Sequence, residues 1–300
     1  MKRLARYLQG KLGVDEGTAN IVSRFVVKAE RNYLMWIYGY DKLARLGIDE
    51  LDLLERLKRP FVFGFLVKEI LDSDLSDEVK ERAALESIES INTDAEFEWV
   101  PAYLFKAINF LLKRRGFERR YFEILVRFGL ALSYGVFYPH VSVMSDEMGD
   151  VKEVFNFMLG ADGLSPEEKI AFLTAVLTHS HINENLKLKL YDEFLRSDRV
   201  PMDLKKELCA SAADDRYMEY AGEKTKPFLT GKDLPLDIPP IQLLFVPPSI
   251  VRRSIRWLAG AGEDKRALIE KYFKEKITDI YPYQTLGALD VCRAYHEELG

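Results

Sequence analysis

The sequence contains little cysteine, glutamine or histidine. Its two cysteines, Cys209 and Cys292, are too few and too far apart for a disulfide framework or a cysteine-based metal site, and they predict buried thiols in a reducing compartment. Only three glutamines accompany a charged fraction of 30%, a bias that hyperthermophilic proteins show, which leaves a thermophilic source open. With four histidines and no Gly-x-Ser-x-Gly or Cys-His signature, no apparatus for nucleophilic catalysis is evident.

Long apolar runs are also absent. The most apolar windows, residues 33–38 and 60–67, are far shorter than the roughly 20 residues that cross a bilayer. The N-terminal residues include no continuous apolar stretch of the kind that a secretory signal requires. Neither of the common glycine-rich phosphate-binding motifs occurs. We therefore expect a cytoplasmic protein without a membrane span or a nucleotide-binding loop.

Negative charge is in excess. The net charge is −5 and the isoelectric point is about 5.6, so the overall balance does not attract nucleic acid, and any anion site must be local. A chain of 300 residues with 48% hydrophobic content can bury one large helical core or two smaller ones.

Apolar residues recur with helical period along most of the chain, and the breaks carry helix start and stop signals. Pro60 and Pro101 are placed to open helices, and Ser165 with Glu168 forms a capping box. Apolar stripes on two sides of residues 183–197 predict a helix packed on both faces. We predict about a dozen helices. The predicted segments are 1–130 (N-terminal helical array), 131–150 (irregular connection), 151–225 (helical hairpin repeats), 226–248 (proline-rich extended segment) and 249–300 (C-terminal helices).

One pattern occurs three times, at residues 70–80, 158–169 and 194–205. In each segment a large apolar residue and Leu end a helix, a small residue and Asp form a turn, and an acid with Lys opens the next helix. The turn aspartates are separated by 88 and 36 residues, which fits two-helix repeats of about 44 residues or fewer. The pattern resembles that of HEAT-type and other α-α repeat proteins, and the resemblance implies stacked helical hairpins. An irregular helical bundle is the alternative.

The densest positive charge lies between two predicted helices, at Lys113, Arg114, Arg115, Arg119 and Arg120, with Arg127 further along. Arginine forks pair well with oxyanions, so this segment is a candidate site for an acidic partner or for phosphates. A second candidate patch consists of Arg252, Arg253 and Arg256. Solvated arginines that pair with the many acids are the alternative interpretation.

Two groups of residues are candidate metal ligands. His179 and His181 with Glu184 place two imidazoles and a carboxylate near a predicted helix end. Asp214 and Asp215 are adjacent, and Glu219 follows one turn later, an arrangement that directs oxygens at a hard cation.

The segment 213–219 resembles the acidic motif with which class I terpenoid synthases hold magnesium and a diphosphate. Residues 145–153 resemble the spacing of the second metal motif in that family, but Gly149 stands where a hydroxyl ligand is expected. The order of the two motifs along the chain is also reversed. The resemblance implies a magnesium-dependent diphosphate enzyme.

We predict from these features an all-α protein of stacked helical hairpins, either a HEAT-like α-α solenoid or an irregular helical array. Its expected function is that of a scaffold or adaptor that binds another protein without a cofactor, and no catalytic residue is identified. The magnesium-dependent enzyme and a nucleic-acid or anion binder acting through residues 114–120 are the alternatives.

Overall fold

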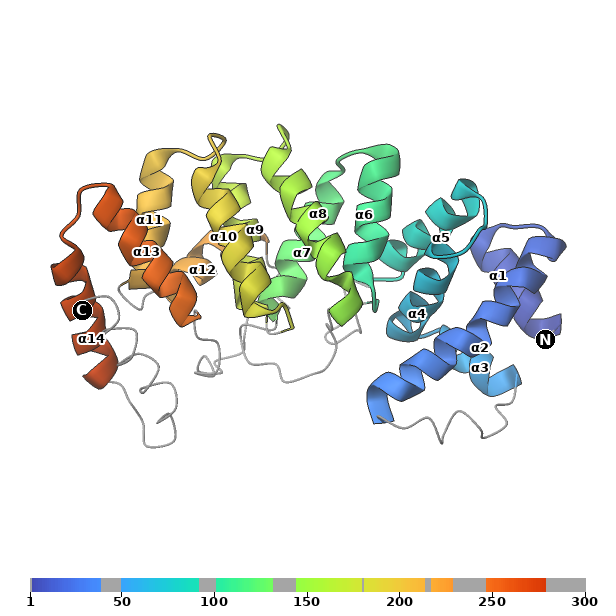
Figure 1. Cartoon of the computed structure of the whole chain (residues 1–300). Coiled ribbons are helices and arrows are strands. Elements are labelled where there is room, and N and C mark those ends of the chain that lie inside the picture. The colour runs from blue at the N-terminus through green and yellow to red at the C-terminus, as the bar shows by residue number, and fades with distance from the viewer. Residues whose placement is uncertain are drawn as a thin grey trace. The chain divides into compact units, whose positions relative to one another are not determined.

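The computed structural model describes residues 2–38, 50–91, 101–131, 144–179, 181–213, 217–228 and 247–278. These residues contain fourteen α-helices and two short 3-10 helices, and no β-strand. The all-α prediction, with about a dozen helices in an array, is therefore confirmed (Figure 1). The helices are α1 (Lys2–Leu12), α2 (Glu16–Tyr38), α3 (Glu50–Leu57), α4 (Pro60–Leu71), α5 (Asp77–Glu89), α6 (Leu104–Arg115), α7 (Arg119–Ala131), η2 (Ser145–Glu147), α8 (Met148–Gly160), α9 (Pro166–Thr178), α10 (Glu184–Arg196), α11 (Met202–Ala213), α12 (Tyr217–Thr225), η3 (Lys226–Phe228), α13 (Pro248–Gly260) and α14 (Lys265–Thr278).

The chain divides into two compact units. Unit 1 comprises Met1–Glu118 and Phe137–Val154, and unit 2 comprises Arg119–Val136 and Phe155–Gly300. Helix α8 begins within the segment 131–150 that the sequence predicted to be irregular, whereas residues 132–143 of that segment lie outside the described residues. No helix among the described residues is long and apolar enough to cross a membrane.

Unit 1 is built around α4, which is buried on nearly all sides. Its sequence, PFVFGFLVKEIL, is apolar around the whole helix, and such a helix is stable only when other helices surround it. Helices α2, α3, α5 and α6 pack against it. Phe65 lies at the centre of an aromatic cluster, with ring centroids 5.9 Å from Tyr33, 5.6 Å from Phe61 and 5.5 Å from Tyr103.

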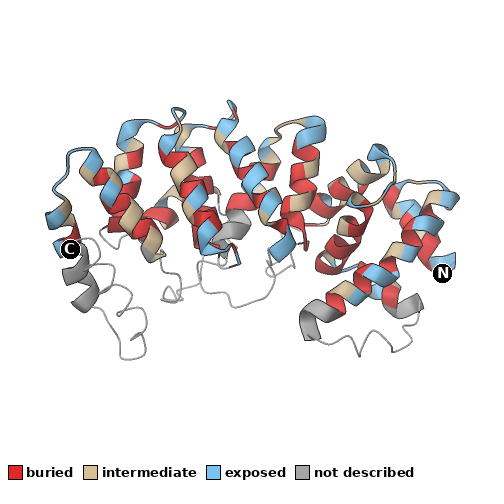
Figure 2. Ribbon diagram, in the orientation of Figure 1, coloured by how far each residue is buried: buried red, intermediate tan, exposed pale blue. Residues whose placement is uncertain are grey.

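Unit 2 has the equivalent helix in α9, whose residues from Lys169 to Thr178 are all buried. Helices α7, α10 and α12 pack against it. Phe172 of α9 stacks on Phe155 at 6.0 Å and approaches Phe122 of α7 at 6.4 Å. Figure 2 shows buried residues concentrated on the faces that the helices of each unit turn toward one another.

Local capping chemistry sets several helix starts. The Ser165 hydroxyl accepts a hydrogen bond from the Glu168 N–H at 3.2 Å, and the Glu168 carboxylate accepts one from the Ser165 N–H at 2.8 Å, so the predicted capping box is present. Asn183 caps α10 through the Leu186 N–H at 2.8 Å. Helix α6 begins at Leu104 rather than at Pro101, because Tyr103 has a left-handed backbone with φ of 60°.

The three segments with the shared pattern each form a connection between two helices. Residues 72–76 join α4 to α5, residues 161–165 join α8 to α9, and residues 197–201 join α10 to α11. The three connections have equal length. Arg199 of the third connection forms an ion pair with Asp162 of the second at 2.5 Å, so these two connections lie side by side in unit 2.

Candidate functional site

The basic residues at the end of α6 are neutralised by acids of α5. Arg114 Nη1 lies 3.4 Å from Asp77 Oδ2, and its Nε lies 3.4 Å from Glu81 Oε2. Arg115 Nε lies 3.7 Å from Glu81 and 3.5 Å from Glu118. Because exposed pairs of this kind stabilise a protein by about 0–1 kcal/mol, their main effect here is to cancel positive charge.

The basic residues at the start of α7 belong to unit 2. Arg119 Nε lies 3.1 Å from Glu123, and its Nη2 contacts Glu168. The hydrogen bond to Glu168 raises the pKa of Arg119. The guanidinium of Arg120 lies over the ring of Tyr121, 5.4 Å from its centroid. These two arginines are therefore already engaged within the chain.

The other residues of the predicted basic patches are divided between the units. Lys113 of unit 1 contacts Glu153. Arg253 of α13 in unit 2 forms an ion pair with Asp192 of α10 at 2.8 Å, and Arg252 and Arg256 also have interaction partners. Arg127 lies in α7, and its side chain is outside the described part of the structure. The role of both patches in binding a partner stays a prediction.

His179, His181 and Glu184, the residues of the predicted histidine site, do not converge on one point. The His179 and His181 rings are 5.8 Å apart, but His179 Nδ1 accepts a hydrogen bond from the His181 N–H at 3.2 Å. Burial lowers the pKa of His179 to about 3, so its ring is neutral at physiological pH. The Glu184 carboxylate accepts a hydrogen bond from the Ser249 hydroxyl at 2.6 Å. Among the described residues, no three His, Cys, Asp or Glu side chains are grouped so that they could hold a metal ion.

The magnesium hypothesis depends mainly on residues outside the described structure. Asp214 and Asp215 lie outside the described residues, whereas Glu219 is exposed on α12 of unit 2. Glu153, from the second acidic segment, belongs to unit 1 and accepts a hydrogen bond from Asn109 at 2.6 Å. The magnesium site therefore stays a prediction.

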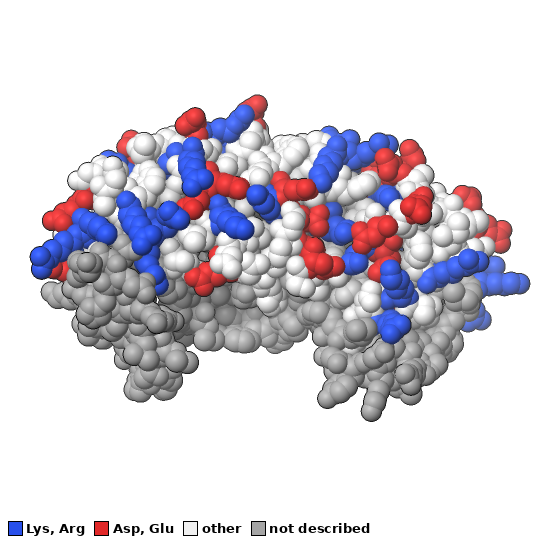
Figure 3. All heavy atoms as spheres, in the orientation of Figure 1, with Lys and Arg blue, Asp and Glu red and all other residues white. Residues whose placement is uncertain are grey.

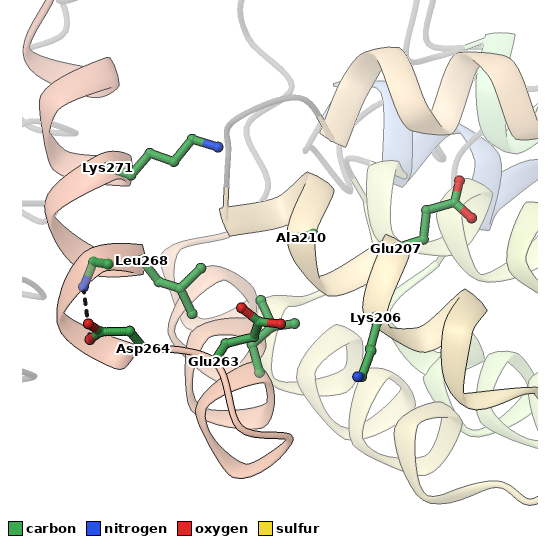
Figure 4. Close-up of a pocket in the computed structure, with 9 residues that line it drawn as sticks. Lys206, Glu207, Ala210, Glu263, Asp264, Leu268 and Lys271 are labelled. Carbon is green, nitrogen blue, oxygen red and sulfur yellow. Dashed lines mark hydrogen bonds between the residues drawn. The ribbon is translucent and has the colours of Figure 1, made fainter.

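A groove of about 440 Å³ lies between α11, α13 and α14 in unit 2, and nothing in the sequence pattern pointed to it. We call it the α11–α14 groove. Figure 4 shows Lys206 and Glu207 extending from α11 and Lys271 extending from α14, on the other side. It is lined by Lys206, Glu207 and Ala210 of α11, Leu258 of α13, Glu263 and Asp264 of the connection, and Ala267, Leu268 and Lys271 of α14.

The groove exists because the chain turns sharply after α13. Gly262 has a left-handed backbone with φ of +100°, and the Glu263 N–H donates to the Leu258 carbonyl at 3.0 Å. This combination is a Schellman motif, in which glycine avoids the steric cost of the left-handed backbone. Asp264 then caps α14 by accepting a hydrogen bond from the Arg266 N–H at 2.9 Å.

Small side chains keep the space between the two helices open. Ala210 of α11 and Ala267 of α14 both line the groove, and neither side chain extends beyond its β-carbon. Leu258 is buried at the floor, while Leu268 is partly exposed. Glu207 forms an ion pair with Lys224 at 3.0 Å, and Asp264 is occupied as a helix cap. The result is an apolar floor with charged walls.

Comparison with protein-family models, with curated protein sequences and with solved structures yields no match to this chain. Function is therefore inferred from the side chains of this chain alone.

Proposed function

We propose that this protein is a helical scaffold or adaptor that holds another protein in the α11–α14 groove. The observation that carries the proposal is the composition of the groove, in which a floor of Ala210, Leu258, Ala267 and Leu268 is bordered by charged side chains. An apolar centre with a polar rim is the usual anatomy of a protein–protein interface. The partner supplies apolar side chains for the floor and carboxylates for Lys206 and Lys271.

The lining favours a protein over a small molecule. Small-molecule sites are mostly apolar and aromatic, with a few convergent polar groups, and they commonly occupy about 300–1,000 Å³. The α11–α14 groove has a volume within that range, but more than half of its lining residues are charged and none is aromatic. Long lysine side chains can adjust to a protein surface, whereas they orient a small substrate poorly.

The arrangement of the helices supports the same function. Hairpins joined by connections of equal length at residues 72–76, 161–165 and 197–201 are typical of helical-repeat proteins, which bind partners through extended surfaces. We place the scaffold in the cytoplasm, in keeping with Cys209, a free thiol whose pKa burial raises to about 11. Such a thiol is unreactive.

A groove-filling variant of the full-length chain tests the proposal. Ala267→Trp places an indole in the groove at an exposed position, so the fold is retained while the floor is covered. Asn185→Trp is the matched control, because it adds the same side chain to an exposed site on α10 outside the groove lining. Both proteins and the wild type are used as bait in extract from the source cells, and the bound proteins are quantified by mass spectrometry.

We expect at least one protein to bind the wild type and Asn185→Trp and to be reduced about tenfold or more on Ala267→Trp. Recovery of the same proteins on all three baits, or of none on the wild type, contradicts the proposal. The magnesium hypothesis has a separate test, since a metal–diphosphate site predicts a higher melting temperature with magnesium and pyrophosphate together.

A further inference from the structure

Helix α2 carries a basic strip on the face that it exposes in unit 1. Arg24, Lys28 and Arg31 are all exposed, and their spacing of four and three residues places them on one side of the helix. The only acid of α2 beyond its first turn, Glu30, is 2% exposed and pairs with Arg56 of α3. No acid of α2 therefore lies within the basic strip.

The charge on this strip is only partly neutralised by neighbouring helices. Lys28 contacts the buried carboxylate of Glu69, but Lys68 also approaches that carboxylate, at 4.0 Å, so one acid is shared by two lysines. Arg31 also has an interaction partner, whereas for Arg24 the described part of the chain provides no ion-pair partner. This differs from the segment 113–120, in which Lys113, Arg114, Arg115 and Arg119 all contact acids.

Two exposed apolar side chains flank the basic strip. Ile21 is 44% exposed and Val27 is 51% exposed, and large apolar side chains with this exposure are few among the described residues. Six residues separate them, which in an α-helix corresponds to about 120° around the axis and about 9 Å along it. They therefore lie on opposite borders of the strip. We call Ile21, Arg24, Val27, Lys28 and Arg31 the α2 face.

Helix α1 also exposes basic side chains in unit 1. It packs against α2 and exposes Lys2, Arg3 and Arg6, while Leu4 and Leu8 are fully buried. Figure 3 shows several basic side chains over the N-terminal helices, at the end of the molecule marked N in Figure 1, with acidic side chains beside them. A chain with a net charge of −5 thus exposes basic side chains on two neighbouring helices, and α1 itself contains no acid.

We propose that the α2 face binds an acidic segment of a partner protein, whose carboxylates pair with Arg24 and whose apolar side chains cover Ile21 and Val27. This surface lies in unit 1 and is independent of the α11–α14 groove in unit 2. The chain then has two binding surfaces, one in each unit, as an adaptor requires.

Charge and shape favour a protein over the other anionic partners. A helix that lies in a membrane surface needs a continuous apolar face, whereas Ile21 and Val27 are separated by the basic strip. Single-stranded nucleic acid is usually held by aromatic side chains on which bases stack, and the exposed apolar side chains here are aliphatic. A protein segment can match separated apolar contacts and central charges together.

Fluorescence anisotropy with the full-length protein tests the proposal. The probes are a fluorescein-labelled helical peptide with glutamate on one face and leucine along its borders, a labelled oligothymidylate, and labelled vesicles of phosphatidylserine and phosphatidylcholine. The variants are Arg24→Glu for charge and Val27→Gln for the apolar contact. Lys189→Glu on the exposed side of α10 is the matched control for charge reversal.

We expect the acidic peptide to bind, and its affinity to fall at least fivefold with Arg24→Glu and about twofold or more with Val27→Gln, while Lys189→Glu has no effect. The proposal is overturned if the peptide does not bind or if Arg24→Glu leaves its affinity unchanged. Tighter binding of the oligonucleotide or of the vesicles, lost in Arg24→Glu but not in Val27→Gln, overturns it in favour of an electrostatic surface for that polyanion. Because the α11–α14 groove is intact in all these variants, failure here leaves the groove proposal standing.

Discussion

The backbone of Ala102 passes so close to Gly64 that a β-carbon added at position 64 would lie 2.1 Å from the Ala102 carbonyl oxygen. Gly64 is in the buried helix α4, and Ala102 is in the turn before α6, where its N–H donates to the Phe61 carbonyl at 3.4 Å. A glycine is required here because any larger side chain would occupy the space of the neighbouring backbone.

Gly64→Ala is therefore expected to lower the free energy of unfolding by about 2–3 kcal/mol, since the clash is with backbone and cannot be relieved by a rotamer change. Gly10→Ala in α1 is the control, because a β-carbon there meets nothing within 4 Å. Alanine is the better helix former, so this control should gain about 0.5–1 kcal/mol. Urea unfolding measures the free energy of unfolding of both variants. An equal change in the two would contradict the close approach of the Ala102 backbone to Gly64.

The buried carboxyl of Glu147 predicts a pH dependence of stability. Burial raises its pKa from 4.5 to about 8, despite hydrogen bonds that the carboxylate accepts from the backbone N–H groups of Met144 and Lys106. Between these pH values the folded state holds a proton that the unfolded state has lost. The free energy of unfolding should fall as pH rises from about 4.5 to 8, by up to about 1.4 kcal/mol per pH unit.

Glu147→Gln removes this titration and should flatten the curve in that window. Glu167→Gln, at an exposed position in the first turn of α9, is the control that should retain the wild-type slope. Chemical unfolding at a series of pH values provides the measurement. A slope in the Glu147→Gln protein equal to that of the wild type would show that Glu147 is not the titrating group.

Lys187 of α10 is a buried amine that should reduce stability. It is 7% exposed, and burial lowers its pKa from 10.5 to about 8. Lys187→Met should raise the free energy of unfolding at pH 7 by about 1–3 kcal/mol, because the charge no longer has to be desolvated. The gain should shrink as pH rises from 8 toward 10.5, where the wild-type amine becomes neutral in both states. Lys189→Met, exposed on the same helix, should change stability little.

A buried hydrogen-bond network joins α10, α11 and α13. Tyr191 Oη lies 2.7 Å from Ser254 Oγ and 3.2 Å from Cys209 Sγ. The Ser254 hydroxyl donates to the Ile250 carbonyl at 2.8 Å, so its oxygen accepts the hydrogen bond from Tyr191. Tyr191→Phe should lower the free energy of unfolding by about 1–1.5 kcal/mol. A double-mutant cycle with Ser254→Ala should show a coupling energy of about 0.5–1.5 kcal/mol between the two side chains.

Tyr217→Phe is the control for that network. The Tyr217 side chain is fully buried, and its hydroxyl has no hydrogen-bond partner in the described part of the chain. Removing an unsatisfied buried hydroxyl should be neutral or stabilising. A loss of stability with Tyr217→Phe as large as that with Tyr191→Phe would show that the two hydroxyls are equivalent.

Helix ends could be predicted from the sequence where capping is local. Pro60 opens α4, the Ser165–Glu168 box opens α9, and Asn183 and Ser197 flank α10, all as expected from residues within one turn of each end. The start of α6 could not be predicted in this way. Pro101 fits a first helical position, but the left-handed backbone of Tyr103 delays the helix, and the close approach to Gly64 on another helix accompanies it.

The α2 face and the α11–α14 groove were harder to predict from the sequence than the helix ends. The spacing of Arg24, Lys28 and Arg31 is visible in the sequence, but their exposure depends on which side of α2 packs against α1 and α4. The α11–α14 groove has no sequence signal at all, since Ala210 and Ala267 belong to helices that are far apart along the chain.

The sequence by itself determined that the chain is helical and where many of its helices begin and end, because helical periodicity and capping involve neighbouring residues. Only the tertiary structure decided which charged side chains remain available to a binding partner. Arg114 is the clearest basic signal in the sequence, yet acids of α5 lie within 4 Å of it, whereas Arg24 stands on a helix whose only later acid points inward. Electrostatic attraction depends on distance in space, and the folding of helix against helix sets that distance.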